Sequence, residues 1–206
     1  PVFYLRKAAS PSGGSAERGP ATPLSAGLFQ SRELLTRPER WYSTCATQAD
    51  FDGDGHIDLL VGNYFQDGAH VLDPKASGTE VMHESKGKAL NGGYKHLFLW
   101  RASRSGGEPL VEYEETLHVF SEEVARGWTL ALGAADLDGD LRPELYLAND
   151  FGPDRLLHNH STPGRVQFAL LEGQRHFITP KSCVVGQDSF KGMGVDFGDL
   201  NGDGFF

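Results

Sequence analysis

The chain has 206 residues with 28 acidic and 19 basic side chains, so its formal net charge is −9. This charge argues against a nucleic-acid-binding protein that works through a basic patch. Hydrophobic residues make up 39% of the chain, which is enough for a packed core. No apolar run approaches the length of about 18 residues that a membrane helix needs. We therefore expect a globular domain without a membrane span.

Turn-forming residues are spread along the chain, with 26 glycines and 11 prolines, so long helices are not expected. Residues 8–27 consist mostly of Ala, Gly, Pro and Ser and predict a flexible loop. A short helix is predicted at 121–126, with Ser121 as its cap. Apolar segments between turn signals predict strands at 59–63, 96–100, 110–113, 145–149, 155–158, 166–171 and 176–178.

The two cysteines, Cys45 and Cys183, permit at most one disulfide. Neither belongs to a Cys-x-x-Cys pair, which would suggest redox or zinc chemistry. One disulfide and two free thiols are both open at this stage.

An acidic pattern occurs three times along the chain. The copies are DFDGDGHID at 50–58, DLDGDLRPE at 136–144 and DLNGDGFF at 199–206. The first two copies lead into predicted strands, and each of these strands ends in an Asn at the same offset, Asn63 and Asn149. The repeat is therefore a loop followed by a strand, and the intervals between copies leave room for three or four short strands.

The spacing of oxygen-bearing residues in each copy suits a calcium ion. Side-chain oxygens at positions 1, 3 and 5, a backbone carbonyl at position 7 and a carboxylate at position 9 converge in a tight loop. The predicted ligands are Asp50, Asp52, Asp54, the His56 carbonyl and Asp58 in the first copy; Asp136, Asp138, Asp140, the Arg142 carbonyl and Glu144 in the second; and Asp199, Asn201, Asp203 and the Phe205 carbonyl in the third. Because packed carboxylates repel one another without a cation, we expect two to three structural Ca²⁺ ions.

Two alternatives compete with the calcium interpretation. An EF-hand needs a bidentate Glu at position 12 and flanking helices, whereas position 12 is Val61 in the first copy and Leu147 in the second. A solvated turn is also rich in Asp and Gly, but three copies in register favour ion binding. The second copy has Leu141 where the others have Gly55 and Gly204, so its site is expected to be weaker or differently bent.

These residues resemble FG-GAP/VCBS repeats, the calcium-loop blades of integrin-α-like β-propellers, from about Trp41 onward. Segments 133–136, 149–152 and 193–199 are further similar to bacterial secreted proteins of the cartilage-acidic-protein-like, ASPIC/UnbV-associated group. The resemblance implies an all-β fold of four-stranded antiparallel blades, with about three blades of a seven-bladed propeller present. Residues 1–40 are then a partial first blade, and residues 41–206 hold the blades with the calcium loops.

Three blades leave two open sheet edges, so we expect the chain to be a fragment of a larger propeller. Its first partners are then the remaining blades, on the same chain or a cleaved one. The sequence begins at Pro1 without a basic-then-apolar leader, and the expectation of a secreted or otherwise extracytoplasmic protein depends on the resemblance alone.

Polar residues beside predicted strand ends, where propellers present binding loops, are the predicted ligand contacts: Asn149, Asp150, Asp154, Arg155 and Asn159. His158 and His160 alternate along a predicted strand, but no third metal ligand lies nearby in the sequence, so we interpret them as exposed strand-end histidines. Ser189 and Lys191 do not make a nucleophilic site, because no oxyanion loop is identifiable.

Two functions are compatible with these observations. The first is a calcium-stabilised propeller that binds a protein or glycan partner. The second is a propeller-scaffold enzyme or accessory protein, acting on a small molecule in enediyne-type biosynthesis or in polysaccharide cleavage, since some members of the resembled group are encoded in enediyne gene clusters. No catalytic residue carries over, because the resemblance implies a fold more than a reaction. A pocket with convergent titratable groups would favour the enzyme.

Overall fold

The computed structural model describes residues 2–7, 25–77, 80–106, 108–188 and 190–206. Residues 8–24 of the predicted flexible loop, and Ser189, lie outside this part of the chain. The chain divides into two compact units. The smaller unit contains residues 1–38 and 100–114, and the larger contains residues 39–99 and 115–206.

The smaller unit contains a two-stranded sheet. Strand β1 (Val2–Arg6) pairs antiparallel with β2 (Phe29–Glu33), which follows the short 3-10 helix η1 (Ala26–Leu28). Arg101 Nε also donates a hydrogen bond to Glu114 Oε2 at 2.6 Å within this unit.

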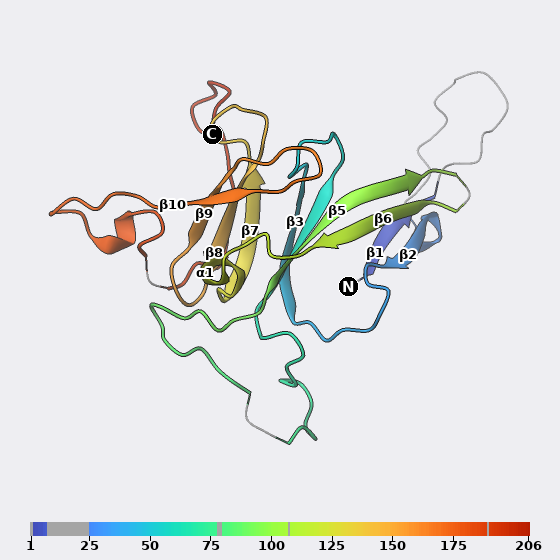
Figure 1. The fold of residues 1–206 in the computed structure, drawn as a ribbon, viewed down its shortest axis with the longest axis horizontal. Coiled ribbons are helices and arrows are strands. Elements are labelled where there is room, and N and C mark those ends of the chain that lie inside the picture. Colours follow the sequence, from blue (N-terminus) through green and yellow to red (C-terminus); the bar gives the residue numbers. More distant parts are fainter. Residues whose placement is uncertain (1, 8–24, 78–79, 107, 189) are drawn as a thin grey trace. The chain divides into compact units, whose positions relative to one another are not determined.

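Most of the regular structure belongs to two four-stranded sheets. The first has the order β3 (Ser43–Ala49), β4 (Asp58–Asn63), β5 (Lys95–Arg104) and β6 (Leu110–Thr116). The second has the order β7 (Thr129–Ala135), β8 (Glu144–Asn149), β9 (Arg155–Asn159) and β10 (Phe168–Leu171). Strands adjacent in sequence are neighbours in each sheet (Figure 1). The prediction of an all-β fold with four-stranded antiparallel sheets is confirmed, and both sheets are consistent with propeller blades.

Two local predictions need correction. Residues 176–178 do not form a strand, because Thr179 N donates to His176 O at 3.0 Å and closes a turn, followed by the 3-10 helix η2 (Lys181–Cys183). Ser121 precedes α1 (Glu122–Ala125) as expected, but its side chain makes no capping hydrogen bond.

One hydrophobic core joins the two sheets. Strand β7 lies against β3 and β4. Leu132 packs against Gly62, where an added Cβ would lie 3.3 Å from the Leu132 Cδ1 atom. Thr44 Oγ1 donates to the Thr129 carbonyl at 2.8 Å across the same interface. The buried core side chains are Phe51, Leu60, Leu97, Leu99, Val124, Leu132, Leu145, Leu147 and Leu157. Each such side chain contributes about 1.5–3 kcal/mol when fully buried.

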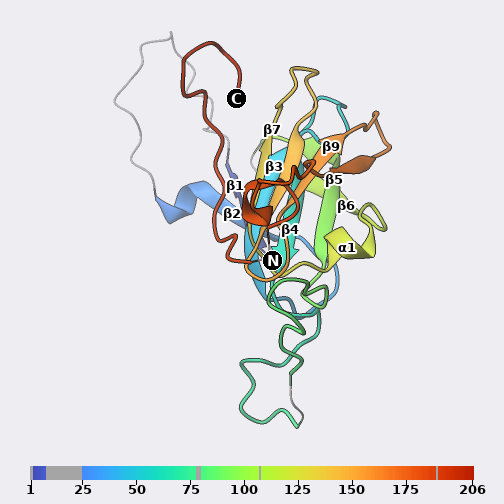
Figure 2. The ribbon, with the colours of Figure 1, turned by 90° about the vertical axis from the view of Figure 1, so that its left-hand side faces the viewer.

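The acidic loops and the long connection 64–94 lie at opposite ends of the two sheets (Figures 1 and 2). The β3–β4 and β7–β8 connections, which hold the first two acidic copies, lie at one end. The described parts of 64–94, which join β4 to β5, extend from the other end. The first two acidic copies, which share one sequence pattern, therefore also lie close together in space.

Cys45 in β3 and Cys183 in η2 are both free thiols, so the disulfide alternative is wrong. Burial raises the pKa of the Cys45 thiol, which keeps it protonated. No helix in the described ranges is long and apolar enough to cross a bilayer.

Candidate metal centre

The three acidic copies fold into loops of the same kind. We call residues 50–58 the first loop, residues 136–144 the second loop and residues 199–206 the third loop. In the first loop, Asp50 Oδ1 accepts hydrogen bonds from the N–H groups of Gly53 and Asp54, and Asp50 Oδ2 accepts one from Gly55. Asp136 and Asp199 accept the same three bonds in their loops. The aspartate at position 1 therefore organises each turn from within the motif.

The backbone at position 6 takes a left-handed conformation in all three loops. Its φ angle is 88° at Gly55, 68° at Leu141 and 90° at Gly204. The prediction that Leu141 bends the second loop differently is thus wrong, because Leu141 adopts the conformation of the glycines. This conformation costs a residue with a Cβ about 1–2 kcal/mol. Weaker ion binding by the second loop stays a prediction.

The carboxylate at position 9 closes each of the first two loops. Asp58 Oδ2 accepts a hydrogen bond from Phe51 N at 2.9 Å, and Glu144 Oε2 accepts one from Leu137 N at 2.8 Å. Both carboxylates are buried, with exposures of 1% and 2%. Because a buried charge is costly without a compensating partner, these groups are suited to a cation as well as to the N–H donors.

Carboxylate oxygens converge in the first and second loops. One oxygen each from Asp50, Asp52 and Asp58 lies within 4.8 Å of the others, and the same holds for Asp136, Asp138 and Asp140. Several hard oxygen donors around one point are the ligand set that Ca²⁺ prefers. The two loops are therefore compatible with metal sites, and the ligand assignments at individual residues stay predictions.

The third loop has two carboxylates and an amide at positions 1, 3 and 5. Asn201 Nδ2 donates to Asp203 Oδ2 at 2.9 Å. Hydrogen bonds from the N–H groups of Gly204 and Gly202 lower the pKa of Asp199, and one from Phe205 N–H lowers the pKa of Asp203. Both carboxylates are therefore held in the ionised form that a cation requires.

The backbone at position 7 is held by the side chain at position 5 in each loop. His56 N donates to Asp54 Oδ1, Arg142 N to Asp140 Oδ1 and Phe205 N to Asp203 Oδ1, at 2.8–2.9 Å. The predicted carbonyl ligands belong to these same residues, so the hydrogen bonds limit where those carbonyls lie. Their coordination of an ion stays a prediction.

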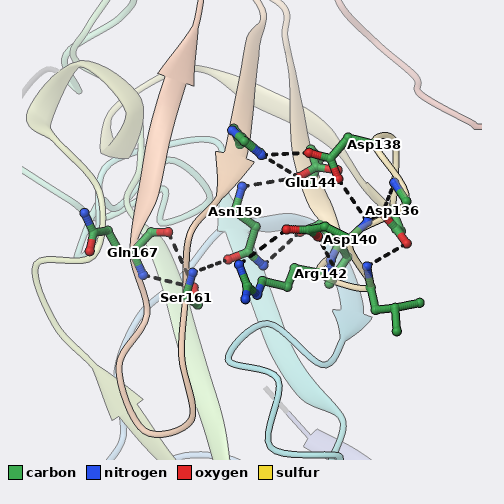
Figure 3. A network of polar contacts seen from close by, with 12 residues as sticks. Asp136, Asp138, Asp140, Arg142, Glu144, Asn159, Ser161 and Gln167 are labelled. Atoms are coloured by element: carbon green, nitrogen blue, oxygen red, sulfur yellow. Dashed lines mark hydrogen bonds and ion pairs between the residues drawn. The ribbon is translucent and has the colours of Figure 1, made fainter.

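Asn159 joins the first and second loops. Figure 3 shows its side chain beside the second loop, near Glu144 and Ser161. Its Nδ2 group donates to the carbonyl of Phe51 at 3.1 Å and to that of Pro143 at 3.0 Å. Its Oδ1 atom accepts from Ser161 N at 2.9 Å, and its backbone N–H donates to Glu144 Oε1 at 3.3 Å. The side chain is fully buried, so Asn159 fixes the position of one loop relative to the other.

A second contact reaches the first loop from the β9–β10 turn. Gly164 N donates to Asp52 Oδ2 at 2.8 Å, while Asp52 Oδ1 accepts from Asp54 N within the loop. Asp52 is thus held by both sheets. No feature of the local sequence around Asp52 indicates this partner, which is 112 residues away.

The remaining predicted ligand contacts are engaged within the fold. Asn149 and Arg155 are buried, with exposures of 2% and 3%. Thr129 Oγ1 donates to Asn149 Oδ1 at 2.6 Å, and Arg155 pairs with Glu123 at 2.6 Å.

The two aspartates of this group accept hydrogen bonds from tyrosines. Tyr64 OH donates to Asp150 Oδ2 at 2.7 Å, and Tyr146 OH donates to Asp154 Oδ2 at 2.9 Å. Burial raises the pKa of Asp154. Contact of any of these residues with an external ligand stays a prediction.

A cavity of about 230 Å³ lies beside β5, lined by residues that include Lys95, His96 and Glu115. His96 Nε2 lies 2.8 Å from Asp67 Oδ2 and its Nδ1 lies 2.6 Å from Glu115 Oε1. Burial lowers the pKa of His96, but the bonds to these carboxylates outweigh it and raise the pKa above its usual value. Trp41 stacks on the same ring at 3.9 Å between centroids. Both ring nitrogens are therefore occupied by partners within the fold.

The neighbouring Lys95 is buried, and burial lowers its pKa to about 7. Its Nζ atom donates to the carbonyls of Gly93 and Gly127. Lys95 therefore ties two connections together. The contacts of His96 and Lys95 are consistent with a structural role for both residues.

The comparison with protein families agrees with the geometry of the loops. Residues 136–206 match the FG-GAP-like repeat family. This match begins at the first residue of the second loop and includes β8, β9, β10 and the third loop. No curated protein matches the chain. The narrower group named from the flanking segments stays a prediction.

Proposed function

We propose that this chain is part of a calcium-stabilised β-propeller that binds a protein or glycan partner outside the cytoplasm. The observation that carries the proposal is the repetition of one acidic loop between the first and second strands of two four-stranded sheets, with carboxylates converging in each loop. The FG-GAP-like repeat match supports it, since such repeats generally form binding propellers.

Calcium acts in this proposal as a structural ligand. An ion that binds only the folded chain stabilises it by about 2.7 kcal/mol at a hundredfold excess over Kd. A thermal melt in calcium and in chelator tests this. We expect chelation to lower Tm, and Asp52→Ala and Asp138→Ala each to reduce the response. Glu112→Gln removes an exposed charge away from the loops and should leave the response unchanged. Equal responses in all four proteins would refute the ligand assignment.

The calcium affinity of the loops tests the proposed extracytoplasmic place. Extracellular calcium modules bind with Kd values near 10⁻⁴–10⁻³ M, whereas cytosolic buffers and sensors bind calcium more tightly. Calorimetric titration measures this directly. A submicromolar Kd would instead fit a cytosolic calcium sensor or buffer and would contradict this part of the proposal.

The proposed binding surface lies at the end of the sheets opposite the loops. Among the described residues of the connection 64–94, the most exposed apolar side chains are Leu72 at 81%, Val81 at 62% and Met82 at 56%. A glycan array and a panel of extracellular proteins, each probed in millimolar calcium and in chelator, test for binding. Calcium-dependent binding that Leu72→Ser and Met82→Ser abolish is the expected result. Cleavage of a bound glycan would favour an enzyme instead.

A further inference from the structure

The second loop has a neighbour that the first loop lacks, the imidazole of His158 in β9. His158 Nε2 lies 2.9 Å from Asp138 Oδ2 and 3.9 Å from Glu144 Oε1. One ligand atom from each of the three residues lies within 4.8 Å of the others. Figure 3 shows the carboxylates of Asp138 and Glu144 close together beside β9. A nitrogen donor and two oxygen donors therefore face a common point.

These spacings fit a small divalent cation. An ion such as Zn²⁺ binds nitrogen and oxygen donors at about 2.0–2.2 Å, which places neighbouring donors roughly 2.9–3.5 Å apart at angles near 90–110°. The distance from His158 to Asp138 lies within this range, and the distance to Glu144 exceeds it by a few tenths of an ångström. A small shift of the His158 or Glu144 side chain would bring all three donor atoms within this range.

The two carboxylates are held in place by hydrogen bonds that leave them facing the imidazole. Glu144 Oε2 accepts from Leu137 N, and Asp138 Oδ1 accepts from Asp140 N at 3.2 Å. His158 precedes the fully buried Asn159, which fixes the backbone at this point of β9. The His158 side chain is 27% exposed, so an ion in solution has access to it.

The first sheet offers an internal comparison. Leu59 pairs with Phe98 in the first sheet as Leu145 pairs with Leu157 in the second. The residue after Phe98 is Leu99, which is 2% exposed and belongs to the core. An apolar side chain thus occupies the position in the first sheet that His158 occupies in the second.

We propose that His158, Asp138 and Glu144 bind a borderline divalent cation of the Zn²⁺ class, so that the second loop differs from the first in metal selectivity. Imidazole is a common ligand for Zn²⁺ and its transition-metal neighbours, whereas Ca²⁺ prefers an all-oxygen shell. Two of its ligands, Asp138 and Glu144, are also predicted calcium ligands in the proposed function. The inference rests on the proposed function only through these two residues. The two ions then compete for the second loop and not for the first.

The test uses metal-stripped protein titrated with Zn²⁺ by calorimetry and with Co²⁺ by visible absorption. His158→Gln removes the nitrogen donor. His56→Gln is the matched control, because the His56 ring lies 3.2 Å from Asp54 Oδ1 in the first loop. We expect one Zn²⁺ per chain, at least a tenfold weaker Zn²⁺ affinity in His158→Gln, and no change in His56→Gln. Equal Zn²⁺ affinity in the wild type and His158→Gln would overturn the proposal.

Two further measurements separate this inference from misfolding and from the proposed function. The ¹⁵N signal of the His158 ring in the unaltered protein should shift on addition of Zn²⁺, and an unmoved signal would contradict the site. The calcium response of the melt should survive in His158→Gln. Tm is also compared with and without chelator in a buffer that contains calcium as its only added metal. If the chelator leaves Tm unchanged there while Zn²⁺ still binds through His158, the calcium proposal fails and the zinc site stands.

Discussion

The replacement Asn159→Ala should destabilise the chain strongly, because one side chain joins both acidic loops. Alanine removes the donors to the carbonyls of Phe51 and Pro143 and the acceptor for Ser161 N. A buried polar group left without a partner costs about 1–3 kcal/mol. Taking about 1 kcal/mol for each of the three groups, since the Pro143 contact is only partly buried, gives a loss of about 3 kcal/mol.

This loss corresponds to a decrease in Tm of about 6–12 °C, because about 1 kcal/mol shifts Tm by 2–4 °C in a chain of this size. Differential scanning calorimetry in chelator measures it without a contribution from calcium. His160→Ala, at the exposed neighbouring position, is the control and should change Tm little. A Tm for Asn159→Ala equal to that of His160→Ala would refute the claim that Asn159 holds the loops together.

Three further predictions concern the other end of the sheets. The pKa of His96 is raised in the folded chain, so its stabilising contribution is fully present below the unfolded pKa of about 6.5 and is lost as pH rises through the folded value. In urea unfolding, His96→Gln should therefore lose the most unfolding free energy relative to the wild type near pH 5.5. A loss that grows with pH would contradict this. The pKa of Lys95 is lowered to about 7, so its burial penalty is fully present below that pH and is relieved as pH rises toward the unfolded value of about 10.4. Lys95→Met should abolish the resulting gain in unfolding free energy between about pH 7 and pH 10, and an unchanged slope would show that Lys95 is not the source. Gly93→Ala should lower Tm because its Cβ would lie 2.7 Å from Asn63 O, whereas Gly194→Ala, with open space around its Cβ, should not; equal melts would contradict the close approach.

The loops themselves could be predicted because their structure is encoded locally. Asp50 reaches its three N–H partners within five residues, and Gly55 supplies the left-handed backbone that the turn needs. The strand that follows each of the first two loops is rich in apolar residues, which is typical of a buried strand. The position of Leu141 shows the limit of such reasoning, because the hydrogen bonds to Asp136 impose the turn despite the Cβ.

The contacts between the sheets could not be predicted in the same way. His158 lacks a third ligand in its own stretch of sequence, and the partners appear only when β9 folds beside the second loop. Asn159 was expected at a binding surface, but it contacts a carbonyl 108 residues away in the first loop. Pairings across such separations depend on tertiary packing and leave no periodic signal.

The Asn that ends both β4 and β8 has a structural role in each sheet. Ser43 Oγ donates to Asn63 Oδ1 at 2.8 Å, and Thr129 Oγ1 donates to Asn149 Oδ1 at 2.6 Å. Both amides are buried and connect the first strand of each sheet to the second. The same offset of this Asn from each of the first two loops therefore indicates a structural role.

The hydrogen bond from Gly164 to Asp52 has a consequence for the chain during its synthesis. The two residues are 112 positions apart, and a ribosome adds about 5–20 residues per second. Gly164 is thus made roughly 6–22 s after Asp52. A β-hairpin forms in about 1–10 μs, so β3 and β4 have ample time to pair before the partner of their loop exists. A nascent chain that ends before residue 164 therefore carries a first loop whose Asp52 has only its local hydrogen bond.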